Sequence, residues 1–437
     1  MRKMRTRMEL DSKASLDCDD PQTFKSAKPR PLMDLGEAIA IAKASTRPIS
    51  HVEIVPLSKS YGRRLARSVQ AGLDLPPFDQ SAMDGYALAG PASSGRYKLV
   101  RNDVGLAGDD PSDLRRGQAA RISTGARIPK GADRVVLQEH ATLLDGRLIV
   151  PHEVTRPGAN IRSFGEDVRL GDTILPRGHK VNARSIAMLA AQGLERIEVL
   201  KLPKVAVVSC GSELRQPGEA LGGSELFDSN RQMLMALATE AGAHVIDAGC
   251  CTDNLQSLSA LLSELSKNND LVVVSGGTSV GEADLTSAAL DDAGAEVRQL
   301  KIAMKPGKPA LIGKLANATI VGLPGNPVAA FVSWQVLVRT MLAMLHGLQH
   351  DPLSGWEALV ASELNRRPGR TEFVPASIVV QGDEKILKFI GPAGSGRLSP
   401  LCQADGFALV ESHRGTVRVG EKVIFLPFRD GDVLQTW

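Results

Sequence analysis

The stretch LVVVSGGTSVGEADLT (residues 271–286) decides the fold of the most regular part of this chain. A run of apolar, mostly β-branched residues ends in a glycine-rich loop, and a helical pattern begins at Leu285. This order is typical of a strand and a helix in an open α/β sheet, where the connecting loop lies at the carboxyl edge of the strands. The loop also holds Glu282 and Asp284, which raises the question of why a phosphate-binding loop would carry two carboxylates.

Strands and helices alternate on both sides of this stretch. The apolar patterns predict strands over residues 205–211, 244–250, 271–277, 296–302 and 318–326. They predict helices over residues 229–243, 255–266, 285–295 and 327–347. Alternating elements with apolar strands indicate a doubly wound, mainly parallel sheet.

Five loops follow the predicted strands and should open at one edge of that sheet, because ligands of such sheets bind at the carboxyl ends of the strands. The loops are CGSE (210–213), CTD (251–253), SGGTSVGEAD (275–284), AMKPGKP (303–309) and LPGNP (323–327). Together they offer backbone amides, two lysines and several carboxylates. We therefore expect a ligand site at this edge.

The glycine loop has two interpretations. Gly276, Gly277 and Gly281 permit positive φ angles and a close approach of backbone to ligand, and the following helix would add N-terminal amides that suit phosphate. The same residues also fit a plain tight turn between strand and helix. The loop is not a Walker A motif, because it lacks the G-x-x-x-x-G-K-[ST] pattern.

The two remaining loops favour an anion. Lys305 and Lys308 bracket a Pro-Gly turn and would bring two cations to the edge, although isolated lysines are more often solvated surface residues. Pro324, Gly325 and Pro327 would hold their loop in a fixed shape, and Pro327 also suits the first turn of a helix.

Four acidic residues add negative charge to an edge built for anions: Glu213, Asp253, Glu282 and Asp284. One explanation is that acidic residues favour the first turn of a helix. The other is that they bind a hard cation such as Mg²⁺, which would bridge carboxylates and phosphate oxygens. Sequence order leaves both explanations open.

The composition predicts a cytoplasmic protein without nucleic acid or membrane partners. The 437 residues include 52 basic and 49 acidic ones, for a net charge of +3. The five cysteines form no C-x-x-C pair, which argues against a disulfide framework. The sequence contains no H-E-x-x-H motif, which argues against a catalytic zinc site. The basic N-terminus lacks the apolar core of a signal peptide, and no apolar run is long enough for a membrane span.

A set of motifs, in this order and spacing, resembles the molybdopterin molybdenumtransferase family, the MoeA family that includes the gephyrin E-domain. The motifs are PPFDQSAMDGYAL (76–88), RISTGARIPKGADRVVLQE (121–139), RPGANIRSFGEDVRLGD (156–172), SCGSEL (209–214), FDSNR (227–231), SGGTSVGEAD (275–284), KIAMKPGKP (301–309) and GLPGNPVAA (322–330). The resemblance covers the chain from about residue 31 to its end.

The resemblance implies four domains in an elongated subunit that dimerises. Domain I is an α/β domain of two segments, domain II is an inserted β-rich domain, domain III is the doubly wound α/β domain, and domain IV is β-barrel-like. The expected ranges are 1–30 for a disordered extension, 31–70 and 165–201 for domain I, 71–164 for domain II, 202–347 for domain III, and 348–437 for domain IV.

The implied reaction inserts molybdate into adenylated molybdopterin and releases AMP in a Mg²⁺-dependent step. The active site would lie between domain III of one subunit and domains of the other. Beyond the homodimer, the resemblance implies transient contact with a molybdopterin adenylyltransferase and with apo-molybdoenzymes.

Site residues follow from matching motifs together with the loop argument. Catalytic roles fall on Asp84, Asp167, Glu213, Asp253, Asp284, Lys301 and Lys305. Substrate-binding roles fall on Thr124, Arg162, Gly276, Gly277, Ser279, Gly281, Lys308, Pro324, Gly325, Pro327, Arg370 and Ser395. Asp253 and Asp284 are the implied Mg²⁺ ligands, and Arg370 and Ser395 match a molybdate pocket in domain IV.

The chain departs from the family pattern at Cys210 and Ser212, where Thr and Asp are common, and at Ala329, where Ser is frequent. Two other functions share some of its features. A molybdopterin adenylyltransferase shares the doubly wound domain, but the motifs outside residues 202–347 favour the molybdenum-inserting enzyme. A non-catalytic gephyrin-like scaffold is the second alternative, and the retained acidic and basic site residues argue against it.

Overall fold

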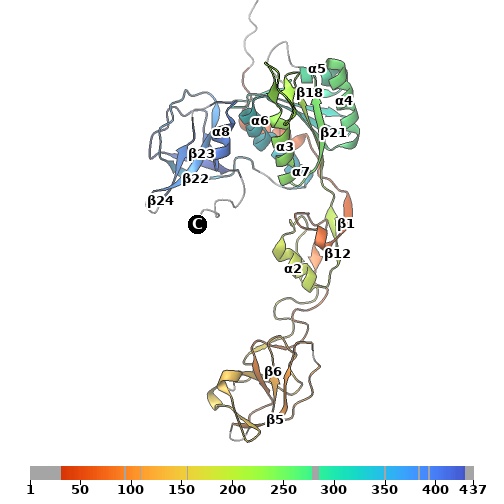
Figure 1. The fold of residues 1–437 in the computed structure, drawn as a ribbon, viewed down its shortest axis with the longest axis vertical. Helices are drawn as coiled ribbons and strands as arrows, with labels where there is room; N and C mark the ends of the chain where they lie inside the picture. Colours follow the sequence, from red (N-terminus) through yellow and green to blue (C-terminus); the bar gives the residue numbers. More distant parts are fainter. Residues whose placement is uncertain are drawn as a thin grey trace, which may run out of the picture.

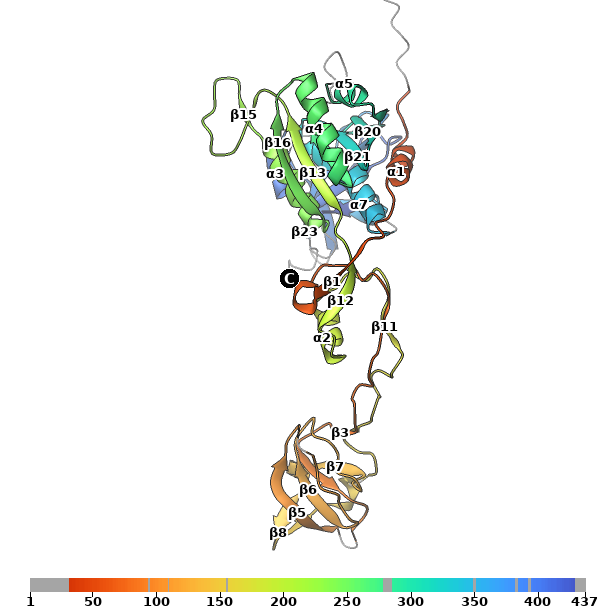
Figure 2. The same ribbon diagram turned by 90° about the vertical axis from the view of Figure 1, so that its right-hand side faces the viewer.

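The computed structural model describes residues 31–92, 95–108, 110–154, 156–277, 285–348, 351–381, 384–391 and 394–428. We keep the names domain I to domain IV for the four predicted segments. The chain is elongated: domains III and IV form a head, domain I forms a narrower stalk, and domain II lies at the far end (Figures 1 and 2).

Domain III contains a six-stranded sheet. In spatial order its strands are β16 (His244–Cys251), β13 (Lys204–Cys210), β17 (Leu271–Ser275), β21 (Ala318–Leu323), β20 (Pro309–Leu315) and β18 (Glu296–Lys301). The pairs from β16 to β21 are parallel, whereas β20 runs antiparallel to both of its neighbours. Because β18 is antiparallel to β20, it ends at the same edge as the parallel strands.

Apolar side chains of the central strands alternate between two covered faces, because successive residues of a strand point to opposite sides. Val205 and Val207 pack on one face and Ala206 and Val208 on the other. The first face is covered by α1 (Leu35–Ala44), α3 (Ser229–Glu240), α6 (Pro327–Ser333) and α7 (Arg339–Leu345). The second face is covered by α4 (Leu255–Asn268) and α5 (Leu285–Asp292). The predicted doubly wound fold is therefore confirmed.

The helical segment Pro327–Leu345 is the apolar centre of domain III. Pro327 occupies its first turn, and one π-helical turn (η4, Trp334–Val338) joins α6 to α7. By length and composition this segment could cross a membrane, but 78% of its apolar window is buried within the fold. Trp334, Leu337 and Met341 are almost fully buried in the first core cluster. The segment is thus a core helix.

Domain II is a curled sheet of six strands. Their spatial order is β7 (Arg134–Leu137), β4 (Gly85–Leu88), β6 (Gln118–Ile122), β5 (Arg96–Gly105), β9 (Arg147–Ile149) and β8 (Thr142–Leu144). Its buried residues form two small separate cores, one around Ala87 and Val135 and the other around Tyr97 and Leu148. Two thin antiparallel ribbons connect it to the stalk: β3 (Gln80–Ser81) with β10 (Ile161–Arg162), and β2 (Val69–Gln70) with β11 (Thr173–Leu175).

Domain I is built from two separate segments of the chain. Its strand β1 (Val52–Pro56) pairs antiparallel with β12 (Arg196–Leu200), which lies on the other side of the domain II insertion. Helix α2 (Ala183–Ala191) and the 3₁₀ turn η1 (Leu57–Lys59) pack beside this pair around Leu65, Leu189 and Val199. The predicted two-segment organisation is therefore present.

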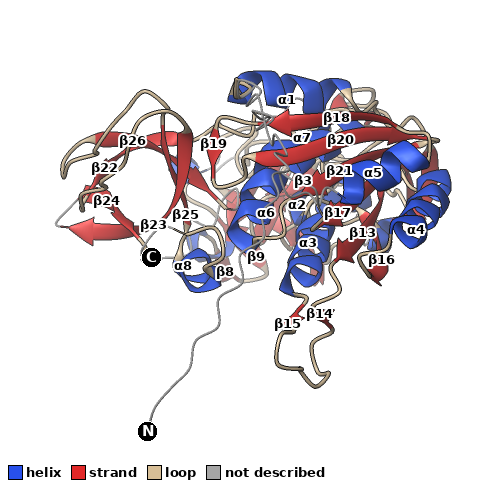
Figure 3. Cartoon of the chain, turned by 90° about the horizontal axis from the view of Figure 1, so that it is seen from above, coloured by secondary structure: helices blue, strands red, loops and turns tan. Residues whose placement is uncertain are grey.

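Domain IV is a closed, barrel-like sheet. Strands β23 (Thr371–Gln381), β24 (Glu384–Phe389), β22 (Trp356–Val360), β26 (Lys422–Pro427) and β25 (Gly406–Val410) pair in a ring, since β25 also pairs with β23. The short strand β19 (Met304–Lys305) of domain III adds to its edge, and α8 (Leu398–Gln403) faces α6 (Figure 3). Domains III and IV therefore share backbone hydrogen bonding.

The sequence patterns missed strand β20, which lies between two predicted strands. Its segment PALIGKL has apolar residues but follows two Lys-Pro turns closely, so it gave no separate strand pattern. Three predicted strands were also too long: residues 276–277, 302 and 324–326 lie beyond the ends of β17, β18 and β21.

Candidate functional site

The described parts of the predicted loops lie at one edge of the domain III sheet. Register places Ser209 beside Ser275, Ser275 beside Leu323, and Cys210 beside Cys251. These strands are parallel, so the residues that follow them emerge side by side. The convergence expected from the sequence is present.

The glycines after β17 are required by close backbone packing. Gly276 has φ +93° and Gly277 has φ +65°. A Cβ atom at Gly276 would lie 2.3 Å from the carbonyl oxygen of Cys210, and one at Gly277 would lie 2.7 Å from Thr286 Oγ1. Thr286 also ties α5 back to the loop, because its amide donates to the Gly277 carbonyl at 3.2 Å. The loop therefore crosses the strand ends closely enough to exclude side chains.

Asp253 is held in place by the loop after β13. Its Oδ2 accepts the Ser212 amide at 2.9 Å, and Ser212 Oγ accepts the Asp253 amide at 3.1 Å. The Cys210 thiol donates to Asp253 Oδ1 at 3.6 Å. Burial, followed by the nearby Asp253 charge, raises the pKa of Cys210 to about 12, so the thiol stays protonated and can donate. Asp253 is thus an exposed carboxylate with a fixed orientation.

Glu213 lies in the same loop and is also exposed. Its carboxylate folds back over Gly211: a Cβ atom on that glycine would lie 2.7 Å from Glu213 Oε2. Glu213 and Asp253 therefore extend from two adjacent strand ends.

The lysines differ from one another. Lys305 Nζ lies 2.7 Å from Glu372 Oε1, and the buried Glu372 also pairs with Arg366 Nε at 3.0 Å. Lys305 therefore links domain III to domain IV through a carboxylate that Arg366 also neutralises. Lys301 and Lys308 are half-buried, and no described residue pairs with their ammonium groups. Of the three predicted cations, only Lys305 has an ion-pair partner among the described residues.

The Pro324–Pro327 loop contacts both the glycine loop and domain IV. A Cβ atom on Gly325 would lie 3.7 Å from Gly276 Cα. The Val328 amide at the start of α6 donates to the Ser395 carbonyl at 2.9 Å. Ser395 therefore lies beside the domain III edge, whereas the Arg370 carbonyl accepts from Arg366 Nη2 on the Glu372 side.

Asn230 belongs to this site but was not predicted. It lies in the first turn of α3, and its Nδ2 donates to Ser275 Oγ at 2.9 Å and to the Gly325 carbonyl at 2.7 Å. The motif FDSNR was noted in the sequence only as part of the family pattern. What distinguishes Asn230 is its position between two predicted loops. That position is visible only in the tertiary structure, so the sequence held no signal for it.

The predicted residues of domain II and the adjoining ribbon form a separate group. Asp84 Oδ1 accepts the amide and the hydroxyl of Thr124 at 2.7 and 2.9 Å, and these bonds hold the pKa of Asp84 below its usual value. Arg162 Nε pairs with Glu166 at 2.9 Å, and Asp167 is exposed nearby. In one chain this group lies at the end of the molecule away from the domain III edge (Figure 2).

Four residues at the centre of the prediction lie outside the described residues: Ser279, Gly281, Glu282 and Asp284. Their roles stay predictions. Within the described ranges, no group of three or more His, Cys, Asp or Glu residues could hold a metal ion. The four described cysteines are free thiols.

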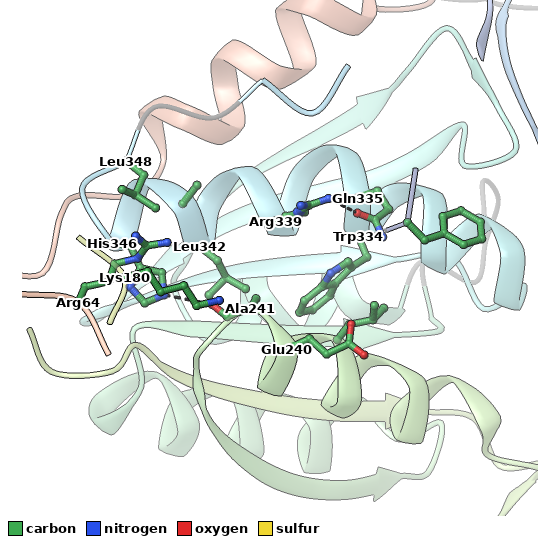
Figure 4. A pocket seen from close by; sticks show the side chains of 13 residues that line it. Arg64, Lys180, Glu240, Ala241, Trp334, Gln335, Arg339, Leu342, His346 and Leu348 are labelled. Carbon is green, nitrogen blue, oxygen red and sulfur yellow. Dashed lines mark hydrogen bonds between the residues drawn. The ribbon is translucent and has the colours of Figure 1, made fainter. Parts of the chain in front are cut away.

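A cleft lies between domains I and III, away from the carboxyl edge of the sheet. Its volume is about 640 Å³, and its lining includes Arg64 and Lys180 from domain I and Trp334, Arg339 and His346 from domain III (Figure 4). A second cleft of about 880 Å³ lies under the start of β21. Neither cleft contains a predicted site residue.

Three family models match successive parts of the chain. The MoeA N-terminal region (domain I and II) matches residues 33–193, the probable molybdopterin binding domain matches residues 206–344, and the MoeA C-terminal region (domain IV) matches residues 357–428.

Whole-length relatives agree with these matches. The molybdopterin molybdenumtransferase of Haemophilus influenzae is 35% identical over 384 residues, which are 87% of this chain and 94% of that relative. Molybdopterin molybdenumtransferase 2 of Mycobacterium tuberculosis is 35% identical over 390 residues, 86% of this chain and 94% of that relative. The crystal structure of a molybdopterin biosynthesis MoeA protein from Pyrococcus horikoshii superposes with a TM-score of 0.76 at 30% identity, covering 91% of this chain and 100% of that one.

Proposed function

Because this chain belongs to the molybdopterin molybdenumtransferase family, whose members work in molybdenum cofactor biosynthesis, we propose that it inserts molybdate into adenylated molybdopterin and releases AMP. The observation that carries this proposal is the convergence at the carboxyl edge of domain III. There the tight glycine turn after β17 and the oriented Asp253 after β16 lie at the same edge of the sheet as Lys301, at the end of β18, and Lys308, just before β20. No described residue pairs with these two ammonium groups.

The chain's own residues would act by binding and orienting. The backbone amides of Gly277, Gly325 and Asn326, which donate to no described residue, would bind phosphate oxygens. The ammonium groups of Lys301 and Lys308 would stabilise the negative charge of the phosphate and of the doubly charged molybdate. No covalent protein nucleophile is needed. Ser395 lies beside this edge, and Arg370 immediately precedes β23, which pairs with β19 of domain III. We propose both for the oxyanion pocket that the sequence predicts.

The donor set at Asp253 fits a magnesium ion. Each carboxylate oxygen accepts one hydrogen bond from Cys210 or Ser212 and keeps a second lone pair free, and the side chain is exposed. Mg²⁺ is commonly held by one or two carboxylates together with substrate phosphates and waters. We propose Asp253 and Asp284 as its protein ligands. When bound, the ion would neutralise charge on the adenylated phosphate and assist the departure of AMP.

A homodimer would complete the site. Asp253 is exposed at the domain III edge, while Asp84 and Thr124 belong to domain II and Arg162 and Asp167 to the ribbon that connects it, away from this edge in the same chain. We propose that domain II and the ribbon of a second copy lie over this edge and contribute those residues. The free cysteines and the buried apolar helix agree with a cytoplasmic enzyme that meets a molybdopterin adenylyltransferase and apo-molybdoenzymes only transiently.

The test is a defined reaction with the purified full chain, adenylated molybdopterin, molybdate and Mg²⁺. We expect AMP release together with a product that activates an apo-molybdoenzyme, and loss of both on chelation of Mg²⁺. Asp253→Asn and Asp284→Asn should each reduce the rate by about 100-fold or more while the protein stays folded.

Asp291→Asn, at the exposed end of α5, is the matched control and should keep the wild-type rate. Synthesis of molybdopterin-AMP from ATP by the wild-type chain would instead identify an adenylyltransferase. Absence of both reactions would favour a scaffold.

A further inference from the structure

Asn230, in the first turn of α3, connects the end of β17 to the Pro324–Pro327 loop of the proposed site. It is 8% exposed, and its Nδ2 donates to Ser275 Oγ at 2.9 Å and to the Gly325 carbonyl at 2.7 Å. A carbonyl oxygen can only accept hydrogen bonds, so the amide nitrogen of Asn230 must face Gly325. One side chain therefore uses both of its N–H groups, one on the last residue of β17 and one on the Pro324–Pro327 loop.

The two acceptors are the residues that set the position of each loop. Ser275 is the last residue of β17, immediately before Gly276 and Gly277. Gly325 is the centre of the loop between β21 and α6, and it lies against Gly276. The Asn230 bridge therefore adds a side-chain tie between the glycine loop and the Pro324–Pro327 loop, beyond the backbone bond from the Gly276 amide to the Leu323 carbonyl at 3.2 Å.

The base of the bridge is rigid. Asp228 caps α3 by accepting the Arg231 amide at 3.1 Å, and it also accepts Arg231 Nε at 2.9 Å and Ser209 Oγ at 2.9 Å. These groups are all buried, so the first turn of α3 is locked to the end of β13. The backbone of Asn230 is therefore held in a fixed position by the neighbouring buried hydrogen bonds.

The bridge has a cost, because Asn230 Oδ1 is buried without a hydrogen-bond partner among the described residues. A buried unpaired acceptor destabilises a fold, and asparagine is a weak helix former. An apolar residue would avoid both penalties but could not connect the loops.

We propose that Asn230 is a positioning residue for substrate binding: it holds the glycine loop and the Pro324–Pro327 loop at the spacing at which their amides receive the phosphate end of the substrate. This inference rests on the proposed function for the identity of the substrate. The bridge itself rests only on the contacts of Asn230.

Asn269 offers a matched control. It is 7% exposed, its Nδ2 donates to the Leu265 carbonyl at 2.8 Å, and its Oδ1 is likewise buried without a described partner. It precedes β17 and therefore lies at the opposite edge of the sheet. Truncating it removes a comparable buried amide without touching either loop.

The first experiment compares Asn230→Ala, Asn230→Asp and Asn269→Ala in the AMP-release assay, with thermal melting of each. Loss of the two bonds should raise the KM for adenylated molybdopterin about tenfold in Asn230→Ala, with a smaller change in kcat. Asn230→Asp keeps the shape but turns a carboxylate toward the Gly325 carbonyl, so its KM should rise at least as much. Asn269→Ala should lower the melting temperature to a similar degree and keep the wild-type KM.

The second experiment needs no turnover: amide hydrogen exchange is measured on peptides that contain residues 275–277 and 323–326. Exchange at both loops should be faster in Asn230→Ala and in Asn230→Asp, and unchanged in Asn269→Ala. If the wild-type chain releases no AMP, the proposed function is wrong, and the exchange data still decide whether the bridge exists. Unchanged exchange in both Asn230 variants, or equal changes in Asn269→Ala, would overturn the inference.

Discussion

The pKa of the buried side chain of His346 depends on the contact between domains I and III. It follows α7 and is 8% exposed, and its Nε2 lies 3.2 Å from the Ala241 carbonyl. Burial, together with the nearby cations Arg64 and Lys180 of domain I, lowers the pKa of His346 to about 4. These groups line the cleft between domains I and III (Figure 4).

This depressed pKa predicts a pH-dependent stability. Between pH 6.5 and about 4 the unfolded chain binds a proton at His346 that the folded chain does not, so the free energy of unfolding falls as the pH falls through this window. The full contribution is about 3 kcal/mol, taken from a shift of roughly two and a half pKa units.

Urea unfolding at pH 7.5, 6 and 5 measures this effect. His346→Gln should flatten the dependence over that range, whereas His244→Gln, at an exposed position, should leave it unchanged. A wild-type stability that is constant from pH 7.5 to 5 would contradict the assignment.

At the scale of elements, the glycine loop shows how strand ends impose a residue type. Gly276 combines a φ of +93° with a backbone neighbour that leaves no room for a Cβ atom. Gly294, after α5, has a similar φ of +77° but open space around it. Substituting these two glycines separately distinguishes the free-energy cost of a positive φ angle from the added cost of a steric clash with the Cβ atom.

Gly294→Ala should cost about 1–2 kcal/mol in unfolding free energy, the penalty of a left-handed non-glycine residue, and should keep activity. Gly276→Ala should cost more, because its Cβ would meet the Cys210 carbonyl, and the displaced loop should bind substrate about tenfold less tightly or worse. Denaturant titration and substrate KM provide the two readouts. Equal effects of both substitutions on KM would argue against a substrate-binding loop.

At the scale of the whole molecule, the elongated shape separates the predicted site residues into two groups. Domain II carries Asp84 and Thr124 far from the domain III edge that carries Asp253 (Figures 1 and 2). A composite site between two copies would reunite them, and subunit mixing tests it directly.

Chains with Asp84→Asn and chains with Asp253→Asn should each be inactive as pure dimers. Coexpressed in equal amounts, they should recover about a quarter of the wild-type rate, because half of the dimers are mixed and each mixed dimer holds one intact site. Affinity tags on the two chains allow the mixed dimer to be isolated. A monomer in light scattering, or no recovery in the isolated mixed dimer, would refute the composite site.

Local pattern was sufficient for much of the fold and for part of the site. Alternating apolar residues such as Val205–Val208 require a strand covered on both faces, and the following helices supply the cover. Loops after parallel strands must share an edge, so the amino-acid pattern alone was enough to place Asp253 and Gly276 together. Strand β20 was missed, since its pairing with β18 and β21 is not encoded in its own short pattern.

The sequence by itself determined the doubly wound sheet, the shared edge of its loops and the family, because these depend on periodicity and on motifs within short windows. Only the tertiary structure decided what those residues touch. It paired Lys305 with Glu372, oriented Asp253 through Cys210 and Ser212, placed Asn230 under two loops, and carried Asp84 to the far end of the chain. The physical reason is that each of these contacts joins residues distant in sequence, so it is set by the packing of whole elements.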